Sequence, residues 1–279
     1  MFSKPLPDTL KVRDAVIEYA RLGSGPPLLY LHGCDGVEVD DPFVSLLARH
    51  FEVVALSLPG FGSSDLPPSL RCMDDLAHFG IELVDALGIR DCILVGSSFG
   101  GWLAAEMATK RTGRFSALVL AAPLGARFTK DPADIELRDI FILPHKEYPY
   151  IFINDRKKAD AAFAGSDFPS MQEGAALRYC RNREAMVLFG WSPLLVNRGL
   201  KDRLHMIDVP TLVLWGDGDK VASLDYGQNY SALIPGAEFE IVADSGHYIP
   251  LESPAIFVDA INAFTVRASF TRARHGAAR

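Results

Sequence analysis

Short runs of consecutive apolar residues recur along the chain, each bounded by glycine, proline or aspartate. Continuous hydrophobicity without alternation is typical of parallel strands that are buried on both faces. Residues 11–23 alternate more regularly and predict an antiparallel hairpin at the edge of a sheet. We expect one further strand at residues 238–246, besides the strands that the apolar runs predict at 28–33, 52–58, 91–97, 116–123 and 211–217.

Between these runs the apolar residues recur every three or four positions, which is the period of an amphipathic helix. Ser69 is placed to cap one helix that Gly88 would end. Further helices are expected from Ser98 to about Arg111, from about Leu224 to Leu233, and from Ile256 to Val266. Strands and helices therefore alternate. This order predicts an α/β fold with a doubly wound, mostly parallel sheet and any site at the carboxyl ends of its strands.

One long stretch, residues 127–205, interrupts the alternation because it contains no strand run and is too long for a simple loop. It is rich in aromatic residues, most of which we expect to pack among themselves. We interpret it as an inserted, mainly helical cap over the strand ends. Residues 1–126 and 206–266 would then form one catalytic core, and residues 267–279 a disordered tail.

Composition narrows the class of protein. The net charge of -7 disfavours a general affinity for nucleic acid or for an anionic membrane. No stretch is long and apolar enough to span a membrane, and the N-terminus has no signal-peptide core. The four cysteines match no metal or redox spacing. We expect a soluble, cytoplasmic protein with reduced thiols, no metal and no cofactor, which acts on a small molecule; its oligomeric state is undetermined.

The strongest chemical signal is the pentapeptide Gly96 to Gly100, GSSFG, which follows a strand and opens a helix. At such a sharp turn the central Ser98 is exposed as a nucleophile, and the glycines are needed where a Cβ would clash. The alternative is a glycine-rich helix start that only packs against the sheet.

A serine hydroxyl needs an imidazole to accept its proton and a carboxylate to orient that imidazole. His247 lies in the loop after the last strand run, where its side chain can reach the site. Asp219 follows the preceding strand and lies further into its loop than the competing Asp217, which suits a hydrogen bond to the backbone. The predicted catalytic residues, in chain order, are Ser98, Asp219 and His247.

Acyl transfer also needs donors for the oxyanion that forms. The backbone N–H of Phe99 follows the nucleophile, and the N–H of Cys34 belongs to a glycine-rich turn after a strand. We expect these two groups to form the oxyanion hole. The Cys34 thiol is then incidental, and His32 holds the turn by hydrogen bonds.

Two other clusters allow more than one interpretation. The glycines of residues 59–65 lack the spacing of a phosphate loop and indicate a structural turn. Among the cap arginines, Arg183 is a candidate to hold a substrate carboxylate, although a salt bridge or a solvated position is the alternative. Trp191 and Tyr248 are the other candidates for contact with substrate.

Taken together, these segments resemble the α/β-hydrolase superfamily from Val12 to about Val266, in the family's order and spacing. The resemblance implies an eight-stranded sheet with a helical cap after the sixth strand. It also implies a nucleophile, acid and histidine at Ser98, Asp219 and His247. The segments that carry it are LLYLHGCDG, LSLPGFGSSD, LVGSSFGGWLAAEMA, PTLVLWGDGDKV and DSGHYIPLESP.

Within the superfamily the chain looks like serine carboxylesterases and carbon-carbon bond hydrolases of ring-fission products. Ser98 disfavours the branches that use an aspartate nucleophile. Tyr248, where the carbon-carbon hydrolases commonly carry Trp, and the turn HGCDG both favour the esterases. The sequence therefore predicts a serine hydrolase of a small, largely apolar ester. The alternatives are hydrolysis of a diketone carbon-carbon bond and, outside enzymes, a small-molecule receptor on the same fold.

Overall fold

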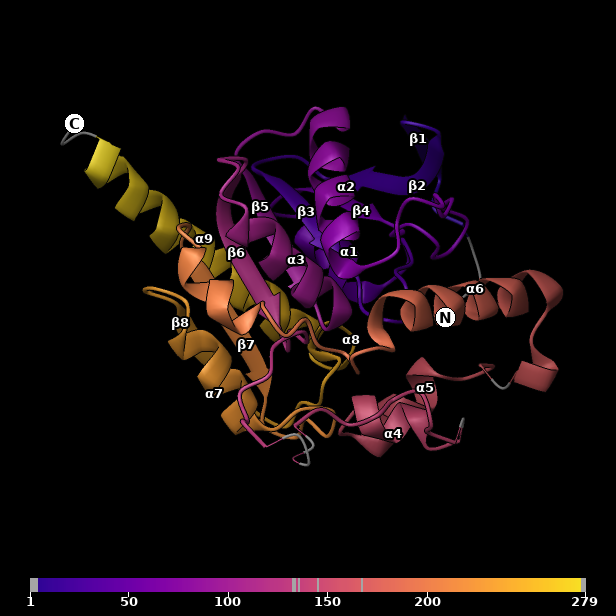
Figure 1. Ribbon diagram of the computed structural model, residues 1–279. Coiled ribbons are helices and arrows are strands. Elements are labelled where there is room, and N and C mark those ends of the chain that lie inside the picture. The colour runs from indigo at the N-terminus through magenta and orange to yellow at the C-terminus, as the bar shows by residue number, and fades with distance from the viewer. Residues whose placement is uncertain (1–4, 132–133, 135, 145, 167, 277–279) are drawn as a thin grey trace.

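A central eight-stranded sheet organises the molecule (Figure 1). The computed structural model describes residues 5–131, 134, 136–144, 146–166 and 168–276. The strand order is β1-β2-β4-β3-β5-β6-β7-β8. The strands are β1 (Asp8–Val12), β2 (Ala15–Leu22), β3 (Pro27–Leu31), β4 (Glu52–Leu56), β5 (Cys92–Ser97), β6 (Phe115–Ala121), β7 (Thr211–Gly216) and β8 (Glu238–Val242).

The pairing confirms a mostly parallel sheet with an antiparallel hairpin at one edge. β1 and β2 pair antiparallel with Asp8 opposite Tyr19, so the hairpin begins before the predicted residue 11. β2 also pairs antiparallel with β4, and all remaining neighbours are parallel. In the middle of the sheet Leu29 lies opposite both Val54 and Leu94. These strands are apolar on both faces because both faces are covered.

Helices cover the two faces of the sheet, and alternate strand residues contribute to separate cores. Leu29 and Leu94 belong to the core beneath α2, α3 and α7, whereas Leu28 and Ile93 belong to the core beneath α1 and α9. This doubly wound arrangement is the predicted one. The helices are α1 (Pro42–Leu47), α2 (Met73–Ala86), α3 (Phe99–Thr109), α7 (Leu224–Ala232), α8 (Ile249–Glu252) and α9 (Pro254–Gly276).

The predicted start of α2 was wrong. Ser69 lies in a turn that is closed by a hydrogen bond from the Leu70 N–H to the Pro67 oxygen (3.0 Å), and the helix begins only at Met73. The carboxylate of Asp75, in the first helical turn, accepts the Arg71 N–H at 2.9 Å. Acidic side chains at this end are favourable because the N-terminus of a helix carries partial positive charge. The predicted end is confirmed, because Gly88 has φ +69°.

The C-terminal segment was expected to be disordered from residue 267, but α9 continues to Gly276. Alanine and arginine, which are frequent here, are among the strongest helix formers. Ala268 is buried, and Arg267 forms an ion pair with Glu238 of β8 at 2.6 Å. Residues 277–279 lie outside the described part of the chain. No described helix combines the length and apolar character that a membrane span requires.

The stretch between β6 and β7 carries the predicted helices. Figure 1 shows α4, α5 and α6 together beyond the carboxyl end of β6. We expected the aromatic residues of this stretch to pack among themselves. Instead, the buried side chains of Phe152, Met186 and Phe189 belong to the core beneath α2 and α3. We retain residues 127–205 as the proposed extent of the cap. Its elements are α4 (Tyr148–Phe152), α5 (Arg156–Ala162), η1 (Phe168–Ser170), α6 (Glu173–Gly190) and η2 (Lys201–Met206).

A buried carboxylate connects α3 to the returning end of the cap. Glu106 is buried, and its oxygens accept hydrogen bonds from Trp102 Nε1 (3.3 Å) and Asn197 Nδ2 (2.7 Å). Arg203 of η2 supplies the opposite charge at 3.1 Å. Removal of the carboxylate would leave these donors without their acceptor in a site that water reaches poorly.

We therefore expect Glu106→Ala to lower the free energy of unfolding by about 2 kcal/mol. The loss is no larger because Arg203 is partly exposed, so water can hydrate its charge once the carboxylate is gone. Urea denaturation followed by circular dichroism measures this loss. Glu238→Ala is the matched control, because its ion pair with Arg267 is about half exposed and should contribute less than about 0.5 kcal/mol. Equal losses in the two variants would contradict the structural role of Glu106.

Candidate active site

Two turns meet where the strand order of the sheet reverses. β3 and β5 are neighbours, but the chain leaves them toward opposite edges, and ligand sites form at such a switch point. The turn after β3 approaches so closely that a Cβ on Gly33 would lie 3.5 Å from Ser98 Cβ. A Cβ on Gly100 would come within 2.1 Å of the Leu31 oxygen. Glycine is therefore required at position 100.

Ser98 occupies the sharp turn between β5 and α3. Its backbone has φ +54° and ψ −114°, a conformation that residues with a side chain rarely adopt. The Ser98 N–H donates to the Ala121 oxygen of β6 at 2.8 Å, which holds the turn against the sheet. A Cβ on Gly96 would lie 2.3 Å from the Gly100 oxygen, so the turn cannot form without that glycine either.

The structure brings the three predicted catalytic side chains into one hydrogen-bonded chain. Ser98 Oγ lies 2.8 Å from His247 Nε2, and His247 Nδ1 lies 2.8 Å from Asp219 Oδ2. An imidazole with its proton on Nδ1 donates to the carboxylate and leaves Nε2 free to accept the serine proton. Such an arrangement can activate a serine hydroxyl as a nucleophile.

The loop after β7 fixes the carboxylate of Asp219. Its Oδ1 accepts the N–H groups of Val221 at 2.7 Å and Ala222 at 3.1 Å, so Oδ2 is directed to the imidazole. Asp217 is exposed, and in the described part of the chain the hydrogen bond to His247 Nδ1 comes from Asp219 instead. The side chains of His247 and Asp219 are 0% and 1% exposed, and Ser98 is also fully buried. All three side chains are therefore shielded from solvent.

Glu252 holds the loop that carries His247. Its buried carboxylate accepts the Gly246 N–H at 2.6 Å, directly before the histidine. The same carboxylate accepts two N–H groups of the cap, from Asn154 at 2.9 Å and Asp155 at 2.6 Å. Sequence reasoning assigned Glu252 no role, and its only signal was an acidic residue inside an otherwise apolar segment.

The turn after β3 contains His32 and Cys34. His32 ties the turn as expected: Nδ1 lies 2.6 Å from the Gly33 oxygen, and Nε2 accepts the Leu58 N–H at 2.9 Å. Burial lowers the pKa of His32 to about 4, so the ring is neutral at physiological pH. Burial likewise raises the pKa of the Cys34 thiol to about 11, which keeps it protonated and poorly nucleophilic.

The two predicted oxyanion donors lie in neighbouring turns: Cys34 in the turn after β3, and Phe99 directly after Ser98. Phe99 is the first residue of α3, where backbone N–H groups have no partner inside the helix. Within the described residues, neither the Phe99 nor the Cys34 N–H donates to another protein group. Both groups therefore have the capacity that an oxyanion hole requires, and their role stays a prediction.

Asp35, the residue after Cys34, collects several of the predicted side chains. The Tyr248 hydroxyl donates to its Oδ2 at 2.5 Å, and Tyr148 of α4 donates at 3.1 Å. Arg183 of α6 forms an ion pair with Oδ1 at 3.2 Å. Tyr248 and Arg183 thus meet beside the turn that carries Cys34, and Arg183 is not a free cation.

Trp191 lies apart from these groups. Its side chain is 50% exposed, and its ring meets Phe141 edge to face with centroids 5.3 Å apart. It lines a cavity of about 500 Å³ together with Arg183. The other lining residues are Ile140, Phe141, Leu143, Tyr148, Tyr179 and Val187. Only a substrate long enough to reach this mainly apolar cavity could contact Trp191.

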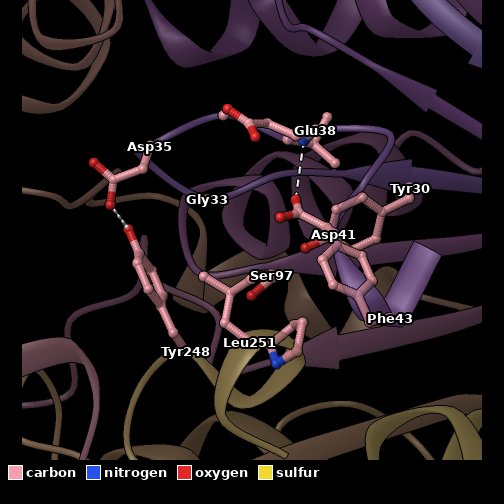
Figure 2. A pocket seen from close by; sticks show the side chains of 12 residues that line it. Tyr30, Gly33, Asp35, Glu38, Asp41, Phe43, Ser97, Tyr248 and Leu251 are labelled. Atoms are coloured by element: carbon pink, nitrogen blue, oxygen red, sulfur yellow. Dashed lines mark hydrogen bonds between the residues drawn. The ribbon is translucent and has the colours of Figure 1, made fainter. Parts of the chain in front are cut away.

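A second, smaller cavity adjoins the turn after β3. Figure 2 shows Gly33, Asp35, Ser97 and Tyr248 around it, with the Tyr248 hydroxyl directed to Asp35. Its volume is about 40 Å³, which suits a few water molecules rather than a substrate. Among the described residues, no group of three or more histidine, cysteine, aspartate or glutamate side chains is arranged to hold a metal ion.

Comparison with known proteins gives a consistent picture. The sequence model of the Alpha/beta hydrolase family matches residues 28–260. A 2-hydroxy-6-oxo-2,4-heptadienoate hydrolase of Pseudomonas putida is 25% identical over 87% of this chain and 90% of its own. Two solved structures share the fold. A meta-cleavage product hydrolase from Pseudomonas fluorescens has a TM-score of 0.74 at 22% identity, covering 94% of this chain and 98% of its own. A thermophilic esterase from Thermogutta terrifontis has a TM-score of 0.68 at 19% identity, covering 95% of this chain and 99% of its own.

The contacts of Glu252 generate a test. In Glu252→Gln one acceptor oxygen becomes an amide that faces backbone donors, so the loop before His247 loses its hold. We expect a loss of about 2 kcal/mol in the free energy of unfolding and a fall in turnover of about tenfold or more. Glu240→Gln, on the exposed side of β8, is the control. Thermal denaturation and steady-state kinetics measure the two effects, and a Glu252→Gln enzyme indistinguishable from that control would exclude the role.

Proposed function

The chain belongs to the alpha/beta hydrolase family, and on this premise we propose that it is a serine hydrolase of small, largely apolar carboxylic esters. The observation that carries the proposal is the buried chain of hydrogen bonds from Ser98 through His247 to Asp219. Binding alone needs no such chain. We assign Ser98 as the nucleophile, His247 as the general base and acid, and Asp219 as the group that orients His247.

The proposed reaction has two halves. His247 Nε2 takes the proton of Ser98 Oγ as the oxygen attacks the ester carbonyl, and Asp219 stabilises the imidazolium. The N–H groups of Phe99 and Cys34 hold the developing oxyanion. His247 then gives its proton to the departing alcohol, which leaves an acyl group on Ser98. Water, deprotonated by His247, attacks the acyl carbonyl and releases the acid.

The cap excludes bulk water from this chemistry. Because Ser98 and His247 are fully buried, substrate must enter through a displacement of the proposed cap, residues 127–205. Closure then strengthens the electrostatic interactions inside the site by removing water from it. The apolar lining of the larger cavity, with Ile140, Leu143 and Val187, favours a substrate with an apolar arm.

Hydrolysis of a carbon-carbon bond is the second candidate, because the Pseudomonas putida relative is named for a heptadienoate substrate. Such a substrate carries a carboxylate and calls for a cation. Arg183 is paired with Asp35 at 3.2 Å, and this pairing favours an uncharged ester instead. A receptor without turnover is not favoured, since the Pseudomonas putida relative is named as a hydrolase and the two similar solved structures are a hydrolase and an esterase.

Covalent labelling with a fluorophosphonate tests the nucleophile. We expect the wild-type protein to be labelled and Ser98→Ala to lose both the label and turnover of p-nitrophenyl butyrate, by about 10⁴-fold or more in kcat. Ser97→Ala removes the neighbouring hydroxyl of the same pentapeptide and is the matched control, which should remain labelled. An unlabelled wild-type protein would overturn the assignment of Ser98.

A comparison of two substrates tests the reaction class. We expect p-nitrophenyl butyrate to have a higher kcat/KM than a vinylogous diketone, because Arg183, a cap cation beside the turn after β3, is already paired with Asp35. Steady-state kinetics with both substrates on one preparation gives the ratio. Faster diketone turnover would reverse the order of the two candidates while leaving the roles of Ser98, His247 and Asp219 intact.

A further inference from the structure

We propose that Asp35 is a positioning residue, whose carboxylate holds the oxyanion turn, residues 33–36, in its full set of contacts only when the cap is closed. Arg183 supplies the positive charge that compensates this carboxylate, which would otherwise repel the oxyanion that forms on the reacting carbonyl. The inference rests on the proposed function, because it assigns the Cys34 N–H to the oxyanion. It adds a coupling between the cap and the chemical step.

Contacts from three separate segments converge on Asp35. Its side chain is 5% exposed and accepts hydrogen bonds from Tyr248 in the histidine loop and from Tyr148 in α4, besides the ion pair with Arg183 of α6. Asn182, also of α6, donates from Nδ2 to the backbone oxygen of Asp35 at 2.8 Å. The side chain and the backbone of the turn are thus both held by the cap.

The hydroxyl groups act as donors because they stay protonated. Burial, reinforced by the charge of Asp35, raises the pKa of the Tyr248 hydroxyl well above its usual value. Burial also raises the pKa of the Tyr148 hydroxyl. Cys34 Sγ lies between them, at 2.9 Å from the Tyr248 oxygen and 3.2 Å from the Tyr148 oxygen. The thiol of the proposed donor residue is therefore locked by the same two rings.

The charge of Asp35 explains the position of Arg183. A carboxylate one residue from the Cys34 N–H would oppose a developing oxyanion unless a cation compensated it. Arg183 compensates it and is itself held over the Tyr148 ring at 4.1 Å and the Tyr179 ring at 5.0 Å. When the cap opens, Tyr148, Asn182 and Arg183 leave together, and the turn keeps the contacts of Tyr248 and His32 but loses those of the cap. The oxyanion donor is then held on all sides only after substrate is enclosed.

Two arginines of α6 allow a matched comparison. Arg183 binds the oxyanion turn, whereas Arg181 binds a different core loop, through hydrogen bonds to the Gly62 oxygen at 2.8 Å and the Ser64 oxygen at 2.5 Å. Arg183→Met and Arg181→Met therefore each remove one guanidinium between cap and core, and only the first should disturb Asp35. Both are made with the exposed Cys72 and Cys180 replaced by serine.

Three readouts separate positioning from general destabilisation. For Arg183→Met we expect kcat for p-nitrophenyl butyrate to fall about 10- to 100-fold with little change in KM, since the interaction lost is one of the transition state. Inhibition by an aryl trifluoromethyl ketone, which forms a tetrahedral oxyanion on Ser98, should weaken by a similar factor. Alkylation of Cys34 by iodoacetamide, located by mass spectrometry, should accelerate by about tenfold or more. Arg181→Met should change each readout by less than about threefold.

A second variant keeps the proposal testable if Arg183→Met folds poorly. Asp35→Asn added to Arg183→Met removes the uncompensated charge and should restore part of kcat, while Cys34 stays more reactive than in the wild-type protein. Equal effects of Arg183→Met and Arg181→Met, or unchanged ketone inhibition and Cys34 reactivity, would overturn the proposal. If the wild-type protein turned over no ester, the proposed function would fail separately, because Cys34 alkylation reports the hold on the turn without turnover.

Discussion

Close approach of backbone to backbone at the carboxyl end of β5 is the constraint on which the site depends. Ser98 points its hydroxyl out of the sheet because the turn forces φ to +54°, and only glycine fits at positions 96 and 100 beside it. Backbone approaches backbone just as closely at the end of β7, before Asp219. A Cβ on Gly216 would lie 2.2 Å from the Ser245 oxygen, so the β7 end and the histidine loop touch directly. These contacts bring residues far apart in sequence within hydrogen-bond distance.

Three buried carboxylates join the cap to the core, and each accepts hydrogen bonds from both sides. Glu106 links α3 to the end of the cap, Glu252 links the histidine loop to residues 154–155, and Asp35 links the turn after β3 to α4 and α6. A buried carboxylate is costly unless donors surround it. Displacement of the segment that carries these donors would therefore break contacts of the side chains that build the site. This shared dependence is the physical basis of the coupling that we propose between substrate enclosure and catalysis.

Much of the fold follows from apolar pattern and glycine position alone. A strand as continuously apolar as residues 91–97 must be covered on both faces. The edge hairpin and the helices follow from the periodicity of their apolar residues. The two local errors have local causes. Ser69 suggested a cap, but a turn at Pro67 delays α2 to Met73. The basic tail suggested disorder, but its helix-forming residues extend α9, anchored by Arg267 on Glu238.

The sequence by itself determined the fold class and named Ser98, Asp219 and His247, because a nucleophile turn and its partners need particular residues at strand ends. It also located Arg183 and Tyr248 as residues of interest without giving their partners. Only the tertiary structure decided that both meet at Asp35 and that Glu252 supports the histidine loop. It also placed Trp191 on the cavity of about 500 Å³. The reason is physical. Local pattern reports burial and backbone shape, whereas a hydrogen bond between residues 35 and 183 depends on how the whole chain brings two distant segments together.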